Sequence, residues 1–133
     1  MQVVISGSAS LQEEIQKYIR YWNSQKDHTV LDYPKVIPRE IFEASYVLAH
    51  KNFMNNITVT DILFIANAKK KGVNSYIGAE TFAELAFGVT QKILYGKKLR
   101  IILAHYPSRS VACYDEIVLW LKLGWIDGVL KGK

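Results

Sequence analysis

Cysteine is nearly absent from this sequence, and long apolar runs are absent altogether. A single cysteine, Cys113, among 133 residues excludes an internal disulfide framework and a cysteine-rich zinc site. No adjacent basic residue activates it, so the thiol is expected to be inert. No stretch approaches the roughly 18 apolar residues of a membrane span, and residues 1–10 lack the charged lead and long apolar segment of a secretion signal. These absences predict a cytoplasmic protein with no membrane partner.

Charge of one sign is concentrated only in two short lysine runs. Seventeen Lys and Arg against twelve Asp and Glu give a net charge of +5, which favours an anionic ligand such as a nucleotide. Outside residues 69–71 and 97–98 the lysines are scattered, and no basic stripe alternates with aromatic residues, so a nucleic-acid partner is not expected. Half of the residues are hydrophobic, enough for the core of one domain over residues 1–133.

Short apolar segments alternate with helical ones along the chain. The strands are expected at residues 2–5, 29–31, 57–66, 100–104 and 125–130. This alternation predicts an α/β protein: a single-domain, flavodoxin-like or Rossmann-like three-layer sandwich with helices on both faces of the sheet. It also predicts a parallel five-stranded sheet of order 2-1-3-4-5.

Local signals place the ends of the helices. Ser10 with Glu13 three residues later is a capping-box pattern, which predicts a first helix from Leu11. Pro38 suits the first turn of a second helix over residues 39–54, and two asparagines follow that helix. The inner face of the second helix would consist of Phe42, Tyr46, Ala49 and Phe53. A last helix, capped by Ser108 or Ser110, would extend to Leu123.

The predicted strand order brings two distant segments together. Its topological switch point falls between strands one and three, where open α/β sheets bind their ligands. Residues 6–10 and 67–84 would therefore line one crevice. The first segment, Ser-Gly-Ser-Ala-Ser, offers hydroxyls and backbone N–H groups to an anion, although such turns also simply connect a strand to a helix.

Two carboxylates, Glu80 and Glu84, lie one helical turn apart and so project from the same side of the third helix. They point away from its apolar stripe, which is typical of a solvated face. However, neither has a basic partner four residues on, and in a partly desolvated crevice such a pair can divide into a charged and a protonated group. A nucleophile and an acid of this kind are what glycosidic cleavage requires. The residues alone leave both interpretations open.

The histidines give weaker signals. His105 follows the fourth strand at the ligand-binding end of the sheet and is a better candidate than His28 or His50. His50 lies beside the apolar face of the second helix, where a packed or surface residue is expected.

Three segments together resemble the nucleoside 2-deoxyribosyltransferase superfamily, which includes the 2′-deoxynucleoside 5′-monophosphate N-glycosidases. They are VVISGSAS in the first turn, TDILFIAN in the third strand and SYIGAETFAELAFG leading into the next helix, and the likeness extends over residues 2–105. The resemblance implies that Glu84 attacks C1′ of a 2′-deoxyribonucleoside and forms a covalent intermediate. It also implies that the turn at Gly7 and Ser8 lines the sugar or a 5′-phosphate, and that Asp61 is structural.

The chain departs from the family in the loop after the third strand, because residues 66–77 contain no acidic residue. We therefore expect Glu80 to act as the acid, and Tyr33 or Tyr76 to stack on the base. The predicted catalytic residues are Glu84 and Glu80, and the predicted substrate-binding residues are Ser6, Gly7, Ser8, Ser10, Asn67, Asn74, Tyr76 and Gly78. No cofactor or metal is expected.

Two functions from different classes follow. The leading one is an N-glycosidase or transferase acting on a nucleoside or nucleotide. The alternative is a nucleotide-binding module on the same fold without catalytic activity, which explains the missing loop acid directly. A homo-oligomer is expected, with Phe87 and Trp120 or Trp125 at its interface.

Overall fold

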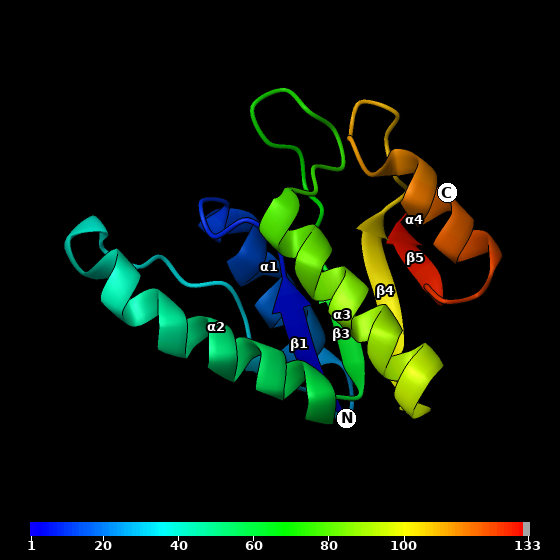
Figure 1. The fold of residues 1–133 in the computed structure, drawn as a ribbon, viewed down its shortest axis with the longest axis horizontal. Helices are drawn as coiled ribbons and strands as arrows, with labels where there is room; N and C mark the ends of the chain where they lie inside the picture. Colours follow the sequence, from blue (N-terminus) through cyan, green and yellow to red (C-terminus); the bar gives the residue numbers. More distant parts are fainter. Residues whose placement is uncertain (132–133) are drawn as a thin grey trace.

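The computed structural model describes residues 1–131 and consists of a parallel sheet with helices on both faces (Figure 1). The strands are β1 (Gln2–Ser6), β2 (Thr29–Asp32), β3 (Ile62–Ile65), β4 (Arg100–His105) and β5 (Gly128–Lys131). The helices are α1 (Gln12–Ser24), α2 (Phe42–Val59, preceded by the 3-10 turn Arg39–Ile41), α3 (Ala79–Tyr95) and α4 (Tyr114–Lys122). The sheet order is β2-β1-β3-β4-β5, which confirms the predicted α/β fold.

The core has two parts because the strand side chains alternate between the faces of the sheet. On one face α1 contributes Ile15, Tyr18 and Trp22. The opposite face is covered by α2, α3 and α4, which contribute Phe53, Ile57, Leu85, Val89 and Ile117. The chain moves outward from β1 to β2 and then returns to β3, so the edge between β1 and β3 is the switch point.

Glu84 is positioned by the close approach of α3 to the sheet. Gly88 lies one turn after it, and a Cβ at Gly88 would be 2.6 Å from Cδ2 of Leu63 and 3.3 Å from Cδ1 of Ile101. Only a glycine allows the helix this separation from β3 and β4 without a shift of the neighbouring side chains.

We therefore expect Gly88→Ala to destabilise the protein by about 1 to 2 kcal/mol, although alanine favours a helix, because the added methyl overpacks a closed interface. Urea denaturation measures the effect. Gly128→Ala is the matched control, since no atom lies within 4 Å of a Cβ built there. Equal stabilities of the two variants would contradict this account of the packing.

Several predicted boundaries were wrong. Residues 57–59 form the last turn of α2 rather than the start of β3. The asparagines do not end the helix, because the Asn56 amide donates to Asp32 Oδ2 (2.9 Å) and Ile57, four residues after Phe53, packs in the core. The fifth strand begins at Gly128 and not at residue 125.

The predicted serine caps were also wrong. α1 begins at Gln12 with Leu11 at its N-cap position, and Ser10 shares a hydrogen bond with Ser8 instead (3.0 Å). α4 begins only at Tyr114, and the hydroxyls of Ser108 and Ser110 bond each other (2.7 Å). In both turns a hydroxyl–hydroxyl contact replaces the cap.

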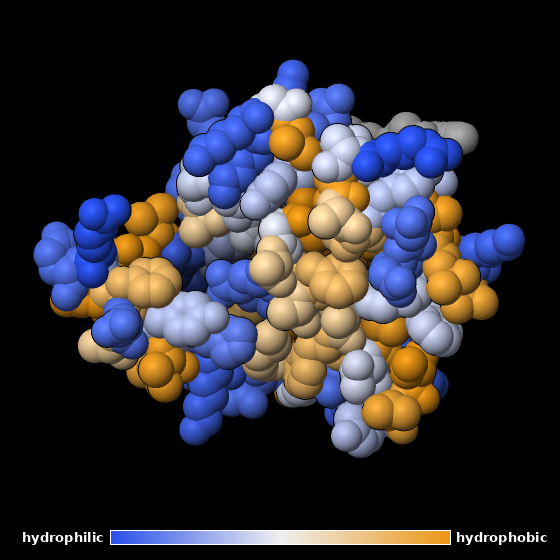
Figure 2. All heavy atoms as spheres, turned by 45° about the horizontal axis from the view of Figure 1, so that its top comes forward, coloured by the Kyte–Doolittle hydropathy of each residue, from blue (hydrophilic) through white to orange (hydrophobic). Residues whose placement is uncertain are grey.

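The amino-terminal half of α2 extends beyond the sheet (Figure 1). Of the four residues predicted to face inward, only Phe53 is buried, whereas Phe42 and Ala49 are exposed and Tyr46 is half-buried. Figure 2 shows hydrophobic side chains on this projecting part of the molecule, at the left of the view. The exposed ones near the start of α2 are Ile41, Phe42, Val47 and Leu48.

None of the helices in residues 1–131 combines the length and the apolar composition that a bilayer crossing requires.

Candidate functional site

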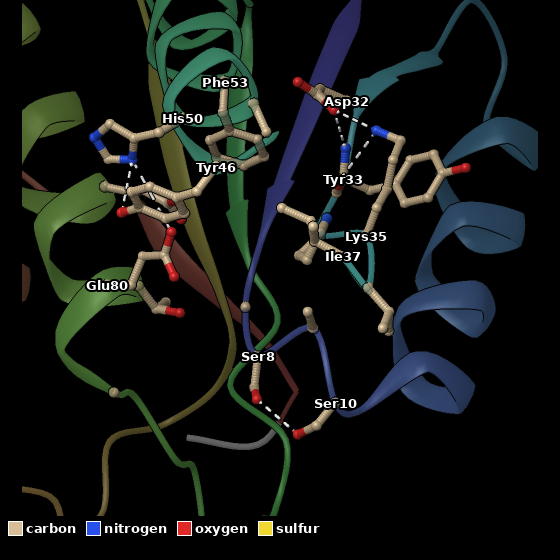
Figure 3. A pocket seen from close by; sticks show the side chains of 18 of the residues that line it. Ser8, Ser10, Asp32, Tyr33, Lys35, Ile37, Tyr46, His50, Phe53 and Glu80 are labelled. Atoms are coloured by element: carbon tan, nitrogen blue, oxygen red, sulfur yellow. Dashed lines mark hydrogen bonds and ion pairs between the residues drawn. The ribbon is translucent and has the colours of Figure 1, made fainter. Parts of the chain in front are cut away.

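A pocket of about 990 Å³ opens at the carboxyl ends of β1 and β2, beside the projecting half of α2 (Figure 3). Its walls are the β1–α1 turn, the segment between β2 and α2, one side of α2, and the start of α3. The predicted site residues in its lining are Gly7, Ser8, Ser10, Tyr76, Gly78, Glu80 and Glu84. The structure thus brings together the two segments that the strand order was expected to join.

Glu84 is the buried acid of this pocket, with 6% of its surface exposed. The Ser6 hydroxyl, at the end of β1, donates a short hydrogen bond to Glu84 Oε1. Burial raises the pKa of Glu84 to about 7; the Ser6 hydrogen bond opposes this, and the charges of Glu80 and Asp32 add to it. Near neutral pH this carboxyl therefore exchanges between an acid and a nucleophilic carboxylate.

Glu80, one helical turn before Glu84, is exposed rather than buried, with 60% of its side chain accessible. Its Oε2 lies 4.0 Å from His50 Nδ1 on α2, and Tyr46 Oη lies 3.3 Å from the same nitrogen. The Tyr46 and His50 rings are stacked, with centroids 5.3 Å apart. Of the two interpretations that the sequence left open, a solvated face does not describe Glu84, which is buried because α2 packs against α3 on that side.

The β1–α1 turn forms a small polar cluster with a lysine that the sequence did not single out. Lys70 Nζ donates to Ser8 Oγ (2.7 Å), and Ser8 in turn contacts Ser10 Oγ (3.0 Å). Lys70 also lies over the Tyr76 ring, 5.0 Å from its centroid. Two hydroxyls and an ammonium group converge here, which is a suitable arrangement for an anion.

The wall opposite α2 combines apolar and polar side chains, and hydrogen bonds hold it in place. Lys35 Nζ lies 2.7 Å from Asp32 Oδ1 and 4.1 Å from the centre of the Tyr33 ring. The Gln12 amide donates to the carbonyl groups of Ala9 (2.8 Å) and Pro34 (3.0 Å), so it joins this wall to the β1–α1 turn.

The two asparagines are not part of the pocket lining. Asn67 is fully buried and exchanges two hydrogen bonds with the His105 backbone, donating to its carbonyl oxygen (2.8 Å) and accepting from its N–H (2.9 Å). Asn74 is exposed in the loop before α3. Asp61 accepts a hydrogen bond from the Gln2 N–H (2.7 Å), a contact consistent with a structural role.

His50, expected from the sequence to be a packed or surface residue, lines the pocket. His105 was preferred because it follows β4, yet it is not among the pocket residues. Cys113, at the N-cap of α4, is half-buried, and burial raises the pKa of its thiol, in keeping with an inert group.

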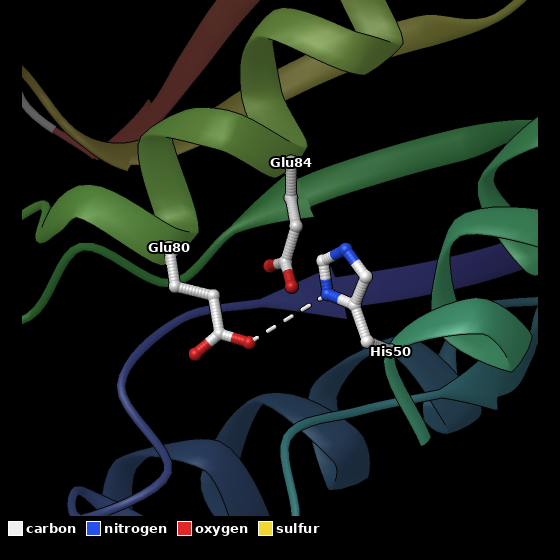
Figure 4. Close-up of side chains that lie close together, drawn as sticks. All are labelled: His50, Glu80 and Glu84. Atoms are coloured by element: carbon white, nitrogen blue, oxygen red, sulfur yellow. Dashed lines mark ion pairs between the residues drawn. The ribbon is translucent and has the colours of Figure 1, made fainter. Parts of the chain in front are cut away.

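His50, Glu80 and Glu84 each offer one nitrogen or oxygen atom within 4.8 Å of the others (Figure 4). A divalent ion fits such a spacing, but so does a set of groups that exchange protons. Because Ser6 already occupies one oxygen of Glu84, the arrangement favours proton chemistry.

Models of known protein families, curated proteins and solved structures were each compared with the chain, and none of them matches it.

Proposed function

We propose that this protein cleaves or transfers the N-glycosidic bond of 2′-deoxyribonucleosides or their 5′-monophosphates, with Glu84 as the nucleophile. The observation that carries the proposal is Glu84 itself, a carboxyl buried at the pocket wall with a pKa near 7 and a serine hydroxyl on one oxygen. Perturbed carboxyls in clefts are characteristic of catalytic sites. The reaction is also the one that the sequence resemblance implies.

The chemistry follows from the surroundings of Glu84. Ionised Glu84 attacks C1′ as the bond to the base breaks, and the positive charge that develops on the sugar lies against its carboxylate. The Ser6 hydroxyl holds one oxygen, so the other is left to form the covalent deoxyribosyl ester. Water or a second base then attacks C1′ and releases Glu84.

The polar cluster of Ser8, Ser10 and Lys70 supports a 5′-monophosphate as the preferred substrate. Hydroxyls and an ammonium group give charge-assisted hydrogen bonds to phosphate oxygens, whereas a free 5′-hydroxyl would use only one of them. The cluster lies on the same pocket wall as Gly7 and within the same cavity as Glu84. A bound nucleotide would then direct its base toward α2.

Replacing Lys70 tests the phosphate assignment. We expect Lys70→Ala to raise KM for deoxynucleoside monophosphates about tenfold, as the loss of one charge-assisted hydrogen bond implies, and to leave nucleoside turnover unchanged. Lys69→Ala, which removes the same charge from an exposed neighbour, is the control. Equal effects of Lys70→Ala on nucleosides and nucleotides would refute the assignment.

Self-association is part of the proposal. The exposed apolar side chains near the start of α2 provide a surface for it, beside the pocket. Phe87, Trp120 and Trp125, the residues first expected at an interface, are partly buried against the chain's own core.

The second candidate function is a nucleotide-binding module without catalysis, which is favoured by the absence of an acid in the loop over residues 66–77. To distinguish the two functions, the protein is incubated with each of the four deoxynucleosides and their 5′-monophosphates, and free base is measured by chromatography. Base release is the expected result. Thermal stabilisation by a nucleotide without release would favour the binding module.

A further inference from the structure

We propose that His50 is the proton donor to the departing base, and that Glu80 is a positioning residue that holds the His50 ring. This inference rests on the proposed function, because it assigns the acid of the same reaction. It replaces Glu80 as the acid and adds a residue from α2, an element that the resemblance did not assign to the chemistry.

The geometry points to His50 because its ring lies within reach of both carboxylates. Figure 4 shows the three side chains turned toward one another, His50 from α2 and the two glutamates from α3. One donor atom from each lies within 4.8 Å of the others. Retaining glycosidases keep nucleophile and acid about 5 to 5.5 Å apart, so the His50–Glu84 separation suits a covalent mechanism.

The exposed fractions of the two side chains favour His50 over Glu80 as the proton donor. Glu80 has 60% of its side chain accessible, so its carboxyl is less shielded from solvent than the His50 ring. His50 has 35% accessible, and histidine is the side chain whose protonation changes between pH 5 and 8. When the ring is protonated, Glu80 at 4.0 Å forms its ion pair.

The titratable and charged groups around His50 come from four parts of the pocket. Tyr46 contacts the ring from α2, and its phenol stays protonated because burial, with Glu80 and Glu84, raises its pKa. The other charged groups of the pocket are Glu80 and Glu84 on α3, Asp32 at the end of β2, Lys35 after it, and Lys70 in the loop after β3.

A Glu84 oxygen forms a bond to C1′, the C1′–N bond breaks, and its electron pair goes to the base nitrogen. An N–H of the His50 imidazolium gives its proton to the base, which leaves as the neutral molecule. In the second half, neutral His50 takes a proton from water as that water attacks C1′, which restores the imidazolium and the Glu84 carboxylate and releases 2-deoxyribose 5-phosphate.

Leaving-group dependence tests the assignment. We expect His50→Gln to lower base release from dGMP about 10²- to 10³-fold, the usual contribution of general acid catalysis. Release from 7-methyl-dGMP should fall less than about tenfold, because the methylated base is already cationic and leaves without a proton. His28→Gln removes a histidine outside the pocket lining and is the matched control.

The pH profile supplies a second readout. The wild type should give a bell-shaped profile for dGMP, and His50→Gln should lose its alkaline limb. Glu80→Gln should lower base release from dGMP more than release from 7-methyl-dGMP, because a misplaced His50 ring donates its proton poorly; a merely structural role for Glu80 would lower both alike. His50→Asn repeats the measurement if the glutamine variant fails to fold.

Several results would overturn the proposal. One is an equal loss on dGMP and 7-methyl-dGMP, and another is an alkaline limb that survives in both His50 variants. Loss of activity in EDTA with recovery in Zn²⁺ would assign His50 to a metal instead. These results differ from those expected if the proposed function itself is wrong, because the wild type would then release no base from either substrate.

Discussion

Glu84→Gln is expected to lower base release at least about 10³-fold on every substrate, including those that need no proton on the leaving base. Glutamine keeps the shape of the side chain and can still accept the hydrogen bond from Ser6, but its amide cannot form the covalent ester to C1′. The loss should therefore appear in kcat and only weakly in KM, which separates it from the loss of Lys70.

The covalent step can be observed directly. Acid quenching of the wild type during turnover, followed by proteolysis and mass spectrometry, should find a deoxyribosyl phosphate adduct on the peptide that contains Glu84. Glu84→Gln should give no adduct, and Glu116→Gln, an exposed glutamate on α4, should behave as the wild type does. Base release that survives in Glu84→Gln would exclude the mechanism and leave the binding module as the better description.

The sequence was sufficient to predict the sheet, because each strand is short, apolar and separated from the next by one helical segment. Order 2-1-3-4-5 followed from that alternation and was confirmed. The helix ends were harder to predict because they depend on tertiary contacts. Asn56 and Ser10 are typical end signals, but their side chains bond to Asp32 and Ser8 instead.

Within the site, the sequence identified Glu84 and its partner from β1 but not the residues that α2 contributes. Glu84 and the β1–α1 turn could be joined because parallel strands place their carboxyl ends together. The orientation of α2 could not be read from its pattern, since its apolar stripe was expected to be buried along its whole length. Because the first half of α2 extends past the sheet, Tyr46 and His50 face the pocket instead of the core.

A second expected result for Glu84→Gln is a gain in stability at alkaline pH. The folded-state pKa of Glu84 is about 7 and the unfolded value is 4.5, so the folded protein holds this proton more tightly. Below about pH 4.5 both states are protonated and the group costs nothing. As the pH rises through 7 the folded protein must keep a buried carboxylate, which costs on the order of 3 kcal/mol relative to the unfolded chain.

We therefore expect urea denaturation to find Glu84→Gln more stable than the wild type by about 3 kcal/mol at pH 8 and nearly equal to it at pH 4.5. Glu80→Gln, at an exposed site, should change the free energy of unfolding by less than about 0.5 kcal/mol at either pH. A glutamate that destabilises its own fold at neutral pH is typical of a site kept for chemistry. If the pH 8 stabilities of Glu84→Gln and the wild type coincide, the carboxyl is solvated in solution and the argument for a nucleophile with a raised pKa fails.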